Sequence, residues 1–381
     1  MRFKYYFLFF LTLIVLGCST MQPGKGLVNS RYSSDFQKVI DSIYARHPDM
    51  IGLMVAIEAP DKNLSWVGAV GYSNYETKQK LKVNQPGLIA SNTKTFVSVA
   101  ILRLIEDGKL GLYAPIENLL SEKTKMRLKR DKYDLKAIKV VHLLSHSSGI
   151  RDYVDEDYLK KISGEPTHRW TRDEQIERAT RRGKPLAGPG KVFSYADVNY
   201  LLLTEIIEQK TKKPFYQAIR ELLNYRQNHL RSIWFATLED APTQVLPLVH
   251  QYDRKEGWDS YDIDVSFDLY GGGGIAATPR DLARFSQLLF EKKIIKDSET
   301  FNLIFTDVGV PGNKHGHYYL GLSESEINGH KAYGHGGFWG TTVQYFPDFN
   351  ASISVFVLNR NQGKLRPSIL EALVKELSGS Y

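Results

Sequence analysis

One serine in this chain is followed three positions later by a lysine. The tetrad Ser-Asn-Thr-Lys covers residues 91–94 and opens a long apolar run that reaches residue 106. The run predicts a buried helix closed by Gly108. Residues three apart on a helix share one face, so we expect the Lys94 ammonium beside the Ser91 hydroxyl. Both would lie at the positive end of the helix dipole.

A serine beside a partly dehydrated lysine is the arrangement of a nucleophile and its base. Burial and the positive helix end both favour the neutral amine, so we expect Lys94 to accept a proton from Ser91. The structural alternative is a serine that caps the helix and a lysine whose ammonium reaches solvent.

Two later turns also carry polar groups. Tyr195 follows a Pro-Gly pair and precedes an apolar helical pattern, with Asp197 two residues further on. A phenol close to an ammonium loses its proton more easily and could act as a base. His335-Gly336-Gly337-Phe338 joins two strand-like runs. Glycines there allow close approach of a substrate, and an exposed N–H could supply half of an oxyanion hole. The alternative for His335 is a structural histidine in a glycine-rich turn.

Serine–lysine, tyrosine and histidine–glycine motifs in this order resemble the three signatures of the serine β-lactamase and penicillin-binding-protein superfamily. The sequence is most similar to the branch of class C β-lactamases, D-alanyl-D-alanine carboxypeptidases and family VIII esterases. The similarity extends from about Asp35 onward. Segments 106–110, 142–149 and 272–278 also resemble short sequence motifs that recur in this branch.

The resemblance implies a covalent mechanism without a cofactor. Ser91 would attack the carbonyl and become acylated. Lys94 and Tyr195 would pass the proton to the leaving group and later help to activate water. The backbone N–H groups of Ser91 and Phe338 would form the oxyanion hole.

The resemblance also assigns groups that hold the substrate. Asp197 stands where the family usually has Asn and would orient the substrate amide or water. His335, next to Gly336 and Gly337, would contact a substrate carboxylate or the Tyr195 hydroxyl. The acid at 197 adds negative charge beside the nucleophile, and His335 replaces the lysine of typical class C β-lactamases. Both departures weaken the case for strong β-lactam hydrolysis.

The implied substrates are small peptides, amides or esters. The predicted envelope location and the mild positive charge favour a carboxypeptidase-like reaction on D-alanyl or D-amino-acid peptides, such as those derived from cell wall, with esters as a side activity. A class C-like β-lactamase is the alternative enzyme. A penicillin-binding sensor that is acylated without turnover is the alternative from another class. Fold alone does not choose among these activities.

The elements that position these residues predict an α+β fold. Strand-like runs lie near both ends of the chain, at 51–58, 64–71, 317–322, 330–334, 341–346 and 352–358. Helical patterns cover 35–47, 366–377 and much of the middle. We therefore expect an antiparallel sheet built from both termini, flanked by helices, with a mostly helical lobe inserted over roughly 91–300. The basic segment 123–139 reads as a solvated loop, or alternatively as a patch for anionic lipid or cell-wall polymer.

The N-terminus predicts export. Arg2 and Lys4 precede an apolar run too short to span a bilayer, which ends at Gly17-Cys18. This ending resembles the bacterial lipobox, in which the cysteine is lipid-modified. We expect a signal peptide over 1–17, a tether over 18–34, a hydrolase domain over 35–381, and a membrane-anchored lipoprotein of the cell envelope. An ordinary signal peptide with a chance cysteine is the alternative.

Composition and histidine spacing bear on other classes. The net charge of +8 includes Arg2 and Lys4. Such a mild positive excess is compatible with binding to an anionic envelope polymer and does not indicate nucleic-acid binding. His142 and His146 have the spacing of a zinc pair, with His315 and His317 further on. No glutamate follows His142 in the metalloprotease pattern, and no Gly-x-Ser-x-Gly elbow of an α/β-hydrolase is present. We expect no metal.

Overall fold

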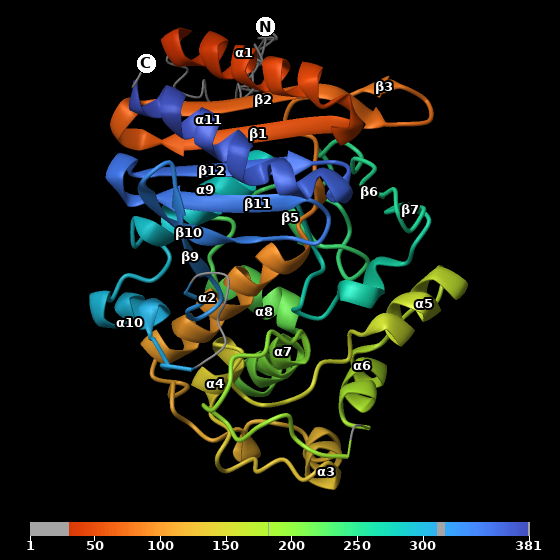
Figure 1. Cartoon of the computed structure of the whole chain (residues 1–381). Coiled ribbons are helices and arrows are strands. Elements are labelled where there is room, and N and C mark those ends of the chain that lie inside the picture. The colour runs from red at the N-terminus through yellow and green to blue at the C-terminus, as the bar shows by residue number, and fades with distance from the viewer. Residues whose placement is uncertain (1–29, 182, 311–316, 380–381) are drawn as a thin grey trace, which may run out of the picture.

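The computed structural model describes residues 30–181, 183–310 and 317–379 (Figure 1). The predicted signal peptide, Cys18 and most of the predicted tether lie outside the described residues. Helix α1 (Ser30–Arg46) begins inside the segment that we expected to be a tether and continues through the predicted helix. Within the described part, no helix has the length and apolar character needed to cross a membrane.

A sheet from both ends of the chain forms the upper half of Figure 1. Its seven strands are antiparallel, and they lie in the order β3-β2-β1-β12-β11-β10-β9. Their bounds are β1 (Gly52–Ala59), β2 (Leu64–Asn74), β3 (Gln79–Lys80), β9 (Ser323–Ile327), β10 (His330–Gly336), β11 (Thr341–Phe346) and β12 (Ala351–Val357). The pairing of β1 with β12 joins the two ends of the chain and confirms the predicted fold class.

Both faces of the sheet are covered, which explains why β1 and β12 are mostly apolar and are buried almost throughout. Helices α1 and α11 (Arg366–Ser378) pack on one face, where Phe36 and Leu373 are fully buried. Helix α9 (Pro279–Phe290) packs against the other face, where Phe285 and Met54 belong to the larger core.

The remaining helices form the lower lobe in Figure 1. They are α2 (Thr93–Glu106), α3 (Glu122–Arg130), α4 (Val140–Leu144), α5 (Glu156–Gly164), α6 (Arg172–Ala179), α7 (Val198–Thr211), α8 (Phe215–Leu222) and α10 (Ser298–Asn302). Short strands β4 (Gly87–Leu88), β8 (Ile275–Ala277) and β5 (Ile233–Phe235) join this lobe to the sheet, and β6 (Tyr252–Asp253) pairs with β7 (Trp258–Asp259). Helix α2 is buried along most of its length, as predicted.

Two local predictions are wrong. Residues 317–322 form no strand, because Gly321 turns the chain at a φ of +82° and the Thr95 hydroxyl of α2 bonds its carbonyl oxygen. The first half of the basic segment 123–139 is helix α3 and not a loop. Arg127 and Arg130 on this helix pair with Asp173 and Glu177 of α6, so these guanidinium groups are already neutralised.

Candidate active site

Ser91 lies in a tight turn that leads into α2. The 3₁₀ turn Ala90–Asn92 precedes the helix, and Ala90 has a φ of +46°, which a residue with a Cβ adopts only under strain. The Asn92 side chain donates to the Ile89 carbonyl at 2.8 Å and to the Thr341 hydroxyl at 2.9 Å. These bonds fix the strained turn against β11 and hold Ser91 at the N-terminus of α2.

Lys94 is fully buried beside Ser91, with three oxygen atoms around its ammonium. The distances from Nζ are 3.0 Å to Ser91 Oγ, 2.5 Å to the Gly272 carbonyl oxygen and 2.6 Å to Asp197 Oδ1. The glycine at 272 matters here, because a Cβ would approach the Asp197 side chain to 3.1 Å. The structure therefore brings the lysine to the serine, as predicted, and adds a carboxylate to the pair.

That carboxylate reverses the predicted charge state of Lys94. Burial would lower the pKa of Lys94, but the adjacent Asp197 carboxylate raises it above its ordinary value. An ammonium taken out of water needs such a partner, since an unpaired buried charge is very costly. In the free protein Lys94 is thus a charged donor to Ser91, and the expectation of a neutral amine is wrong.

Tyr195 lies over this pair, in the loop just before α7. The Lys94 ammonium is 4.9 Å from the centre of the Tyr195 ring, and the Tyr195 hydroxyl lies near enough to Lys94 and Ser91 for both to lower its pKa. Loss of hydration around that hydroxyl raises the pKa of Tyr195 to about 12, although the ammonium opposes the rise. The Lys94 ammonium does lower the pKa of Tyr195, as predicted, but burial raises that pKa by more. Tyr195 is therefore a neutral phenol at neutral pH.

His146 supports Tyr195 from below. It is fully buried, its ring centre is 4.2 Å from that of Tyr195, and its Nδ1 accepts the Ala196 N–H at 3.2 Å. Nε2 therefore carries the proton, and it has no hydrogen-bond partner among the described residues. The sequence places His146 in a segment that resembles a recurring family motif, but it did not predict that His146 packs against Tyr195.

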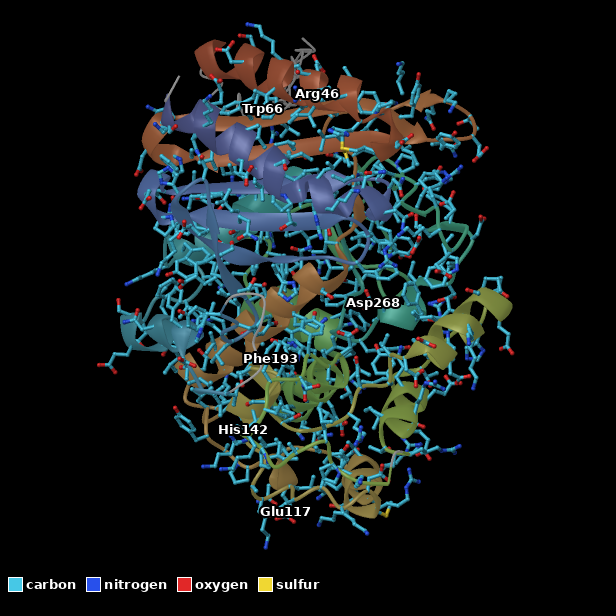
Figure 2. All side chains as sticks on the ribbon, viewed as in Figure 1. Arg46, Trp66, Glu117, His142, Phe193 and Asp268 are labelled. Carbon is cyan, nitrogen blue, oxygen red and sulfur yellow. The ribbon has the colours of Figure 1, made fainter. Side chains whose placement is uncertain are left out.

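Asp152 and Asp268 surround Asp197 and were not found from the sequence. The Asp152 carboxylate accepts the backbone N–H of Val198 at 3.3 Å, at the start of α7. Asp268 lies where the sheet half meets the helical lobe (Figure 2), and a Cβ on Gly273 would lie 2.1 Å from its carboxylate.

The charges of these two acids depend on their neighbour. Burial, then the charge of Asp197, raises the pKa of Asp152 to about 7 and that of Asp268 to about 8. Asp268 is therefore mostly protonated at pH 7, and Asp152 is partly protonated. The centre holds three carboxyl groups near one ammonium without carrying three negative charges.

The turn between β10 and β11 faces Ser91 from the sheet. A Cβ on Gly337 would lie 2.3 Å from both the Ile89 carbonyl oxygen and the Thr341 hydroxyl, so only glycine lets the two turns approach. The backbone bonds of this turn run from Gly337 N–H to Thr341 O and from Gly340 N–H to Gly337 O. Phe338 N–H takes part in neither.

Arg366 of α11 supports the same turn. Its guanidinium donates to the carbonyl oxygens of Gly337 and Thr341, and it lies 3.3 Å from where a Cβ on Gly336 would be. Sequence reasoning missed this arginine, because its position in the chain gives no sign of proximity to the turn.

His335 does not make the contacts expected from the resemblance. Its Nδ1 donates to the Gly336 carbonyl at 2.6 Å, and its Nε2 accepts from the Tyr318 hydroxyl at 3.2 Å. Burial and the Lys94 ammonium lower the pKa of His335 to about 4, so the imidazole is neutral. A neutral, buried ring with both nitrogens engaged is no partner for a substrate carboxylate.

The other histidines that the sequence considered as metal ligands have separate partners. His142 Nδ1 accepts the Lys139 N–H, and His317 pairs with Asp307, while His315 lies outside the described residues. In the part of the chain that the structure describes, no three His, Cys, Asp or Glu side chains are grouped as metal ligands.

A family model described as Beta-lactamase matches residues 40–376. Protein flp of Staphylococcus aureus (strain MW2) is 31% identical over 152 residues, 40% of this chain and 28% of that relative. The chain thus aligns with less than a third of that relative's length.

Solved structures match over nearly the whole chain. The D-stereospecific amidohydrolase from Streptomyces sp. has a TM-score of 0.75 and 22% identity, and the match covers 91% of this chain and 99% of that one. The D-amino acid amidase from Ochrobactrum anthropi SV3, complexed with L-phenylalanine amide, has a TM-score of 0.76 and 22% identity, and covers 92% and 99%. These likenesses show the same fold. With the family model matching most of its length, the chain belongs to the Beta-lactamase family, within the superfamily of serine β-lactamases and penicillin-binding proteins.

Proposed function

We propose that this protein is an amidase that forms an acyl-enzyme at Ser91 and acts on small amides of D-amino acids or D-peptides, with esters as a side activity. One observation carries the proposal: Ser91 Oγ, at the start of a buried helix, lies 3.0 Å from Lys94 Nζ and within hydrogen-bonding reach of the Tyr195 hydroxyl. A nucleophile, a proton carrier and a cation thus meet at one point.

The charge states favour a proton relay over a free base. Lys94 is charged and Tyr195 is neutral in the resting site, so neither waits as a strong base. As the Ser91 oxygen bonds to the substrate carbon, its proton passes to the Tyr195 oxygen, which gives its own proton to the leaving nitrogen. A hydroxyl that donates while it accepts needs no low pKa. The ammonium stabilises the negative charge that passes across the serine and phenol oxygens.

Backbone donors would hold the developing oxyanion. The N–H groups of Ser91 and Phe338 are proposed for this task, the first at the N-terminus of α2 and the second on the turn that Gly337 brings close. Donors fixed in the backbone need no reorganisation during the reaction, and the loss of one such donor typically costs about 10²–10³-fold in kcat.

The charge around the site favours amides over substrates that end in a carboxylate. A carboxypeptidase must hold the terminal carboxylate of its substrate, but His335 is neutral and Lys94 is already paired with Asp197. Arg366 is engaged with backbone carbonyls, and Arg360 lies over the Phe338 ring and pairs with Asp253. The expected carboxypeptidase-like reaction and the alternative of strong β-lactam hydrolysis both need a free cation, and none of these four side chains is one.

A substrate panel with a labelling control tests the proposal. Purified protein is assayed on D-amino-acid amides, D-Ala-D-Ala peptides, nitrophenyl esters and a chromogenic cephalosporin. We expect turnover of the D-amides and esters to exceed that of the peptides and the cephalosporin. A fluorescent fluorophosphonate should label Ser91, and Ser91→Ala should abolish the label. An adduct on another serine contradicts the nucleophile assignment, while labelling without turnover of any substrate supports an acylation-only sensor.

The envelope location is a separate proposal that rests on the Leu16-Gly17-Cys18 sequence. We propose that Cys18 is lipid-modified and that the domain is held at a membrane facing the periplasm or the exterior, since several acyl chains on one residue anchor stably. Fractionation of cells that express Cys18→Ala should move the protein from the membrane to the soluble fraction. Equal membrane recovery of the variant and wild type contradicts this.

A further inference from the structure

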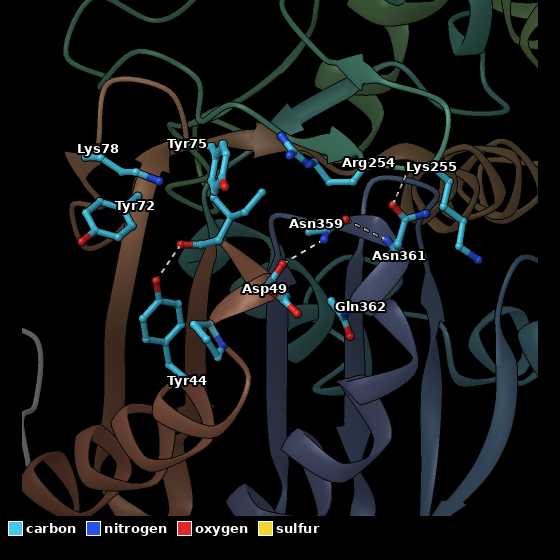
Figure 3. A pocket seen from close by; sticks show the side chains of 12 residues that line it. Tyr44, Asp49, Tyr72, Tyr75, Lys78, Arg254, Lys255, Asn359, Asn361 and Gln362 are labelled. Atoms are coloured by element: carbon cyan, nitrogen blue, oxygen red, sulfur yellow. Dashed lines mark hydrogen bonds between the residues drawn. The ribbon is translucent and has the colours of Figure 1, made fainter.

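A second concave site lies away from Ser91, where the end of α1 meets two hairpins and the segment after β12 (Figure 3). Its volume is about 500 Å³. The β2–β3 hairpin contributes Tyr72, Tyr75 and Lys78, and the β6–β7 hairpin contributes Arg254 and Lys255. We call this site the outer groove.

Positive charge dominates the outer groove. Lys78, Arg254 and Lys255 line it together with a single acid, Asp49. Within the described part of the chain, the two lysines have no carboxylate at ion-pair distance, and Arg254 has only a long contact of 3.8 Å with the exposed Glu76. Isolated surface lysines are ordinary, but three weakly compensated cations in one hollow attract an anion.

A tyrosine ring fixes two of these cations in place. The Lys78 ammonium lies 3.7 Å from the centre of the Tyr75 ring, and the Arg254 guanidinium carbon lies 4.5 Å from it. Such cation–π contacts are modestly favourable at exposed sites. They hold two like charges near one point before any ligand arrives, which lowers the ordering cost of binding.

The groove also presents groups that suit hydroxyls: the side-chain amide of Gln362 has no hydrogen-bond partner among the described residues, and the face of Tyr72 is close by.

We propose that the outer groove binds an acidic, hydroxyl-bearing ligand, namely a sugar acid or a sugar phosphate, alone or within a glycan chain. The anionic group would lie between Lys78 and Arg254, and the hydroxyls would meet the amide and tyrosine side chains. A flat anionic membrane would touch projecting cations, whereas these line a hollow, so the shape favours a compact ligand. The site is independent of the reaction proposed for Ser91.

The outer groove borders a second hollow. Lys255 and Asn361 also line this hollow of about 730 Å³, bordered by Trp258 and Arg360. The Arg360 guanidinium lies 3.5 Å from the centre of the Phe338 ring, on the turn proposed for the oxyanion hole.

Calorimetric titration of the full-length protein in detergent tests the proposal. The ligands are oligogalacturonate as the sugar acid, glucose 1-phosphate as the sugar phosphate, and neutral malto-oligosaccharide and inorganic phosphate as controls. We expect one or both acidic sugars to bind, and both controls to bind at least about tenfold more weakly, a difference of 1.4 kcal/mol. Lys78→Glu should weaken the acidic ligand by a similar factor, while Lys136→Glu, the same charge change in the helical lobe, should not.

A pair of conservative variants separates binding from folding. Tyr75→Phe keeps the ring and should bind normally, whereas Tyr75→Leu releases both cations and should weaken binding, with thermal midpoints close to wild type in each case. Equal binding of neutral and acidic sugars, equal binding of inorganic phosphate, or normal binding by Lys78→Glu overturns the proposal. Binding of anionic phospholipid vesicles without binding of either sugar also overturns it. Fluorophosphonate labelling of Ser91 is measured alongside, so failure of this site is distinguished from failure of the hydrolase proposal.

Discussion

The molecule contains two lysine–tyrosine pairs that differ in almost every other respect. In the catalytic centre, the Lys94 ammonium lies 4.9 Å from the Tyr195 ring, is fully buried and pairs with Asp197. In the outer groove, the Lys78 ammonium lies 3.7 Å from the Tyr75 ring, is exposed and has no acidic partner in the described part of the chain.

The difference shows how burial changes the task of the same two side chains. A buried ammonium must be compensated inside the protein, so its carboxylate, its protonation and its hydrogen bonds are all fixed in the fold. An exposed ammonium is compensated by water and by any anion that arrives. The first pair is therefore suited to steering a proton, and the second to binding an anionic ligand.

The largest expected effect comes from removing the buried cation. Lys94→Met should lower kcat on a D-amino-acid amide by about 10²–10⁴-fold, because the proton relay loses the charge that stabilises it. The affinity of the outer groove for oligogalacturonate should not change. Steady-state kinetics and calorimetry measure the two, with Lys136→Met as the matched control. Near-normal turnover in Lys94→Met would contradict the catalytic role that distinguishes the Lys94–Tyr195 pair from the Lys78–Tyr75 pair.

A smaller loss is expected when the partly exposed Tyr195 ring loses the buried His146 ring that packs against it. His146→Ala leaves the Ala196 N–H without its acceptor, at a cost of about 1–3 kcal/mol in unfolding free energy, and frees the Tyr195 ring. We expect kcat to fall roughly tenfold with KM nearly unchanged.

His146→Asn sharpens that result. Asparagine tolerates the backbone φ of +53° and offers an acceptor oxygen, but no ring. It should recover part of the stability while kcat stays low. If kcat recovers together with the melting temperature, the histidine is only structural.

The third prediction concerns the carboxylate that distinguishes the two pairs. Asp197 raises the pKa of both Lys94 and Tyr195, so Asp197→Asn should lower both. The proton relay needs both Lys94 and Tyr195 in their protonated forms. As pH rises and these two groups lose their protons, kcat/KM should therefore fall. In the variant this descending limb should lie at lower pH. An unmoved limb would mean that the pair is not the titrating group, and an ascending limb would favour a free base.

The smallest effect is on stability. Asp268 has its pKa raised to about 8, so the folded protein holds a proton there that the unfolded chain has released above about pH 4. Stability linked to this proton is present at low pH and is lost as pH rises toward 8. Asp268→Asn cannot titrate, so its melting temperature should decline less than that of wild type between pH 6.5 and 8. Parallel melting curves across that range would contradict the assigned shift.

Local patterns were enough to predict much of the fold. The buried character of α2, the first two strands and the pairing of the chain ends follow from periodicities of 3.6 and 2. Residues 317–322 were wrongly predicted to form a strand. Their apolar side chains pack against α2, and in sequence such a short apolar run looks the same as a buried strand. The helical start of segment 123–139 was missed because its ion pairs with Asp173 and Glu177 lie about fifty residues away in sequence.

The same division holds in the candidate site. Sequence spacing placed Ser91 and Lys94 together, since three residues along a helix is a fixed distance. Motif order predicted that Tyr195 and the Gly337 turn would join them, and the fold does bring them there. The hydrogen bond between His335 and the Tyr318 hydroxyl was not predicted, because nothing in the sequence indicates that pairing.

By itself, the sequence determined which side chains could form a nucleophile and a proton carrier, because those depend on residue type and short spacing. Only the tertiary structure decided their charges. Asp152, Asp197 and Asp268 come from three separate segments, and the pKa of Lys94 depends on how close their carboxylates come and how little water remains. Coulomb energies vary with distance and dielectric, and neither quantity exists until the chain has folded.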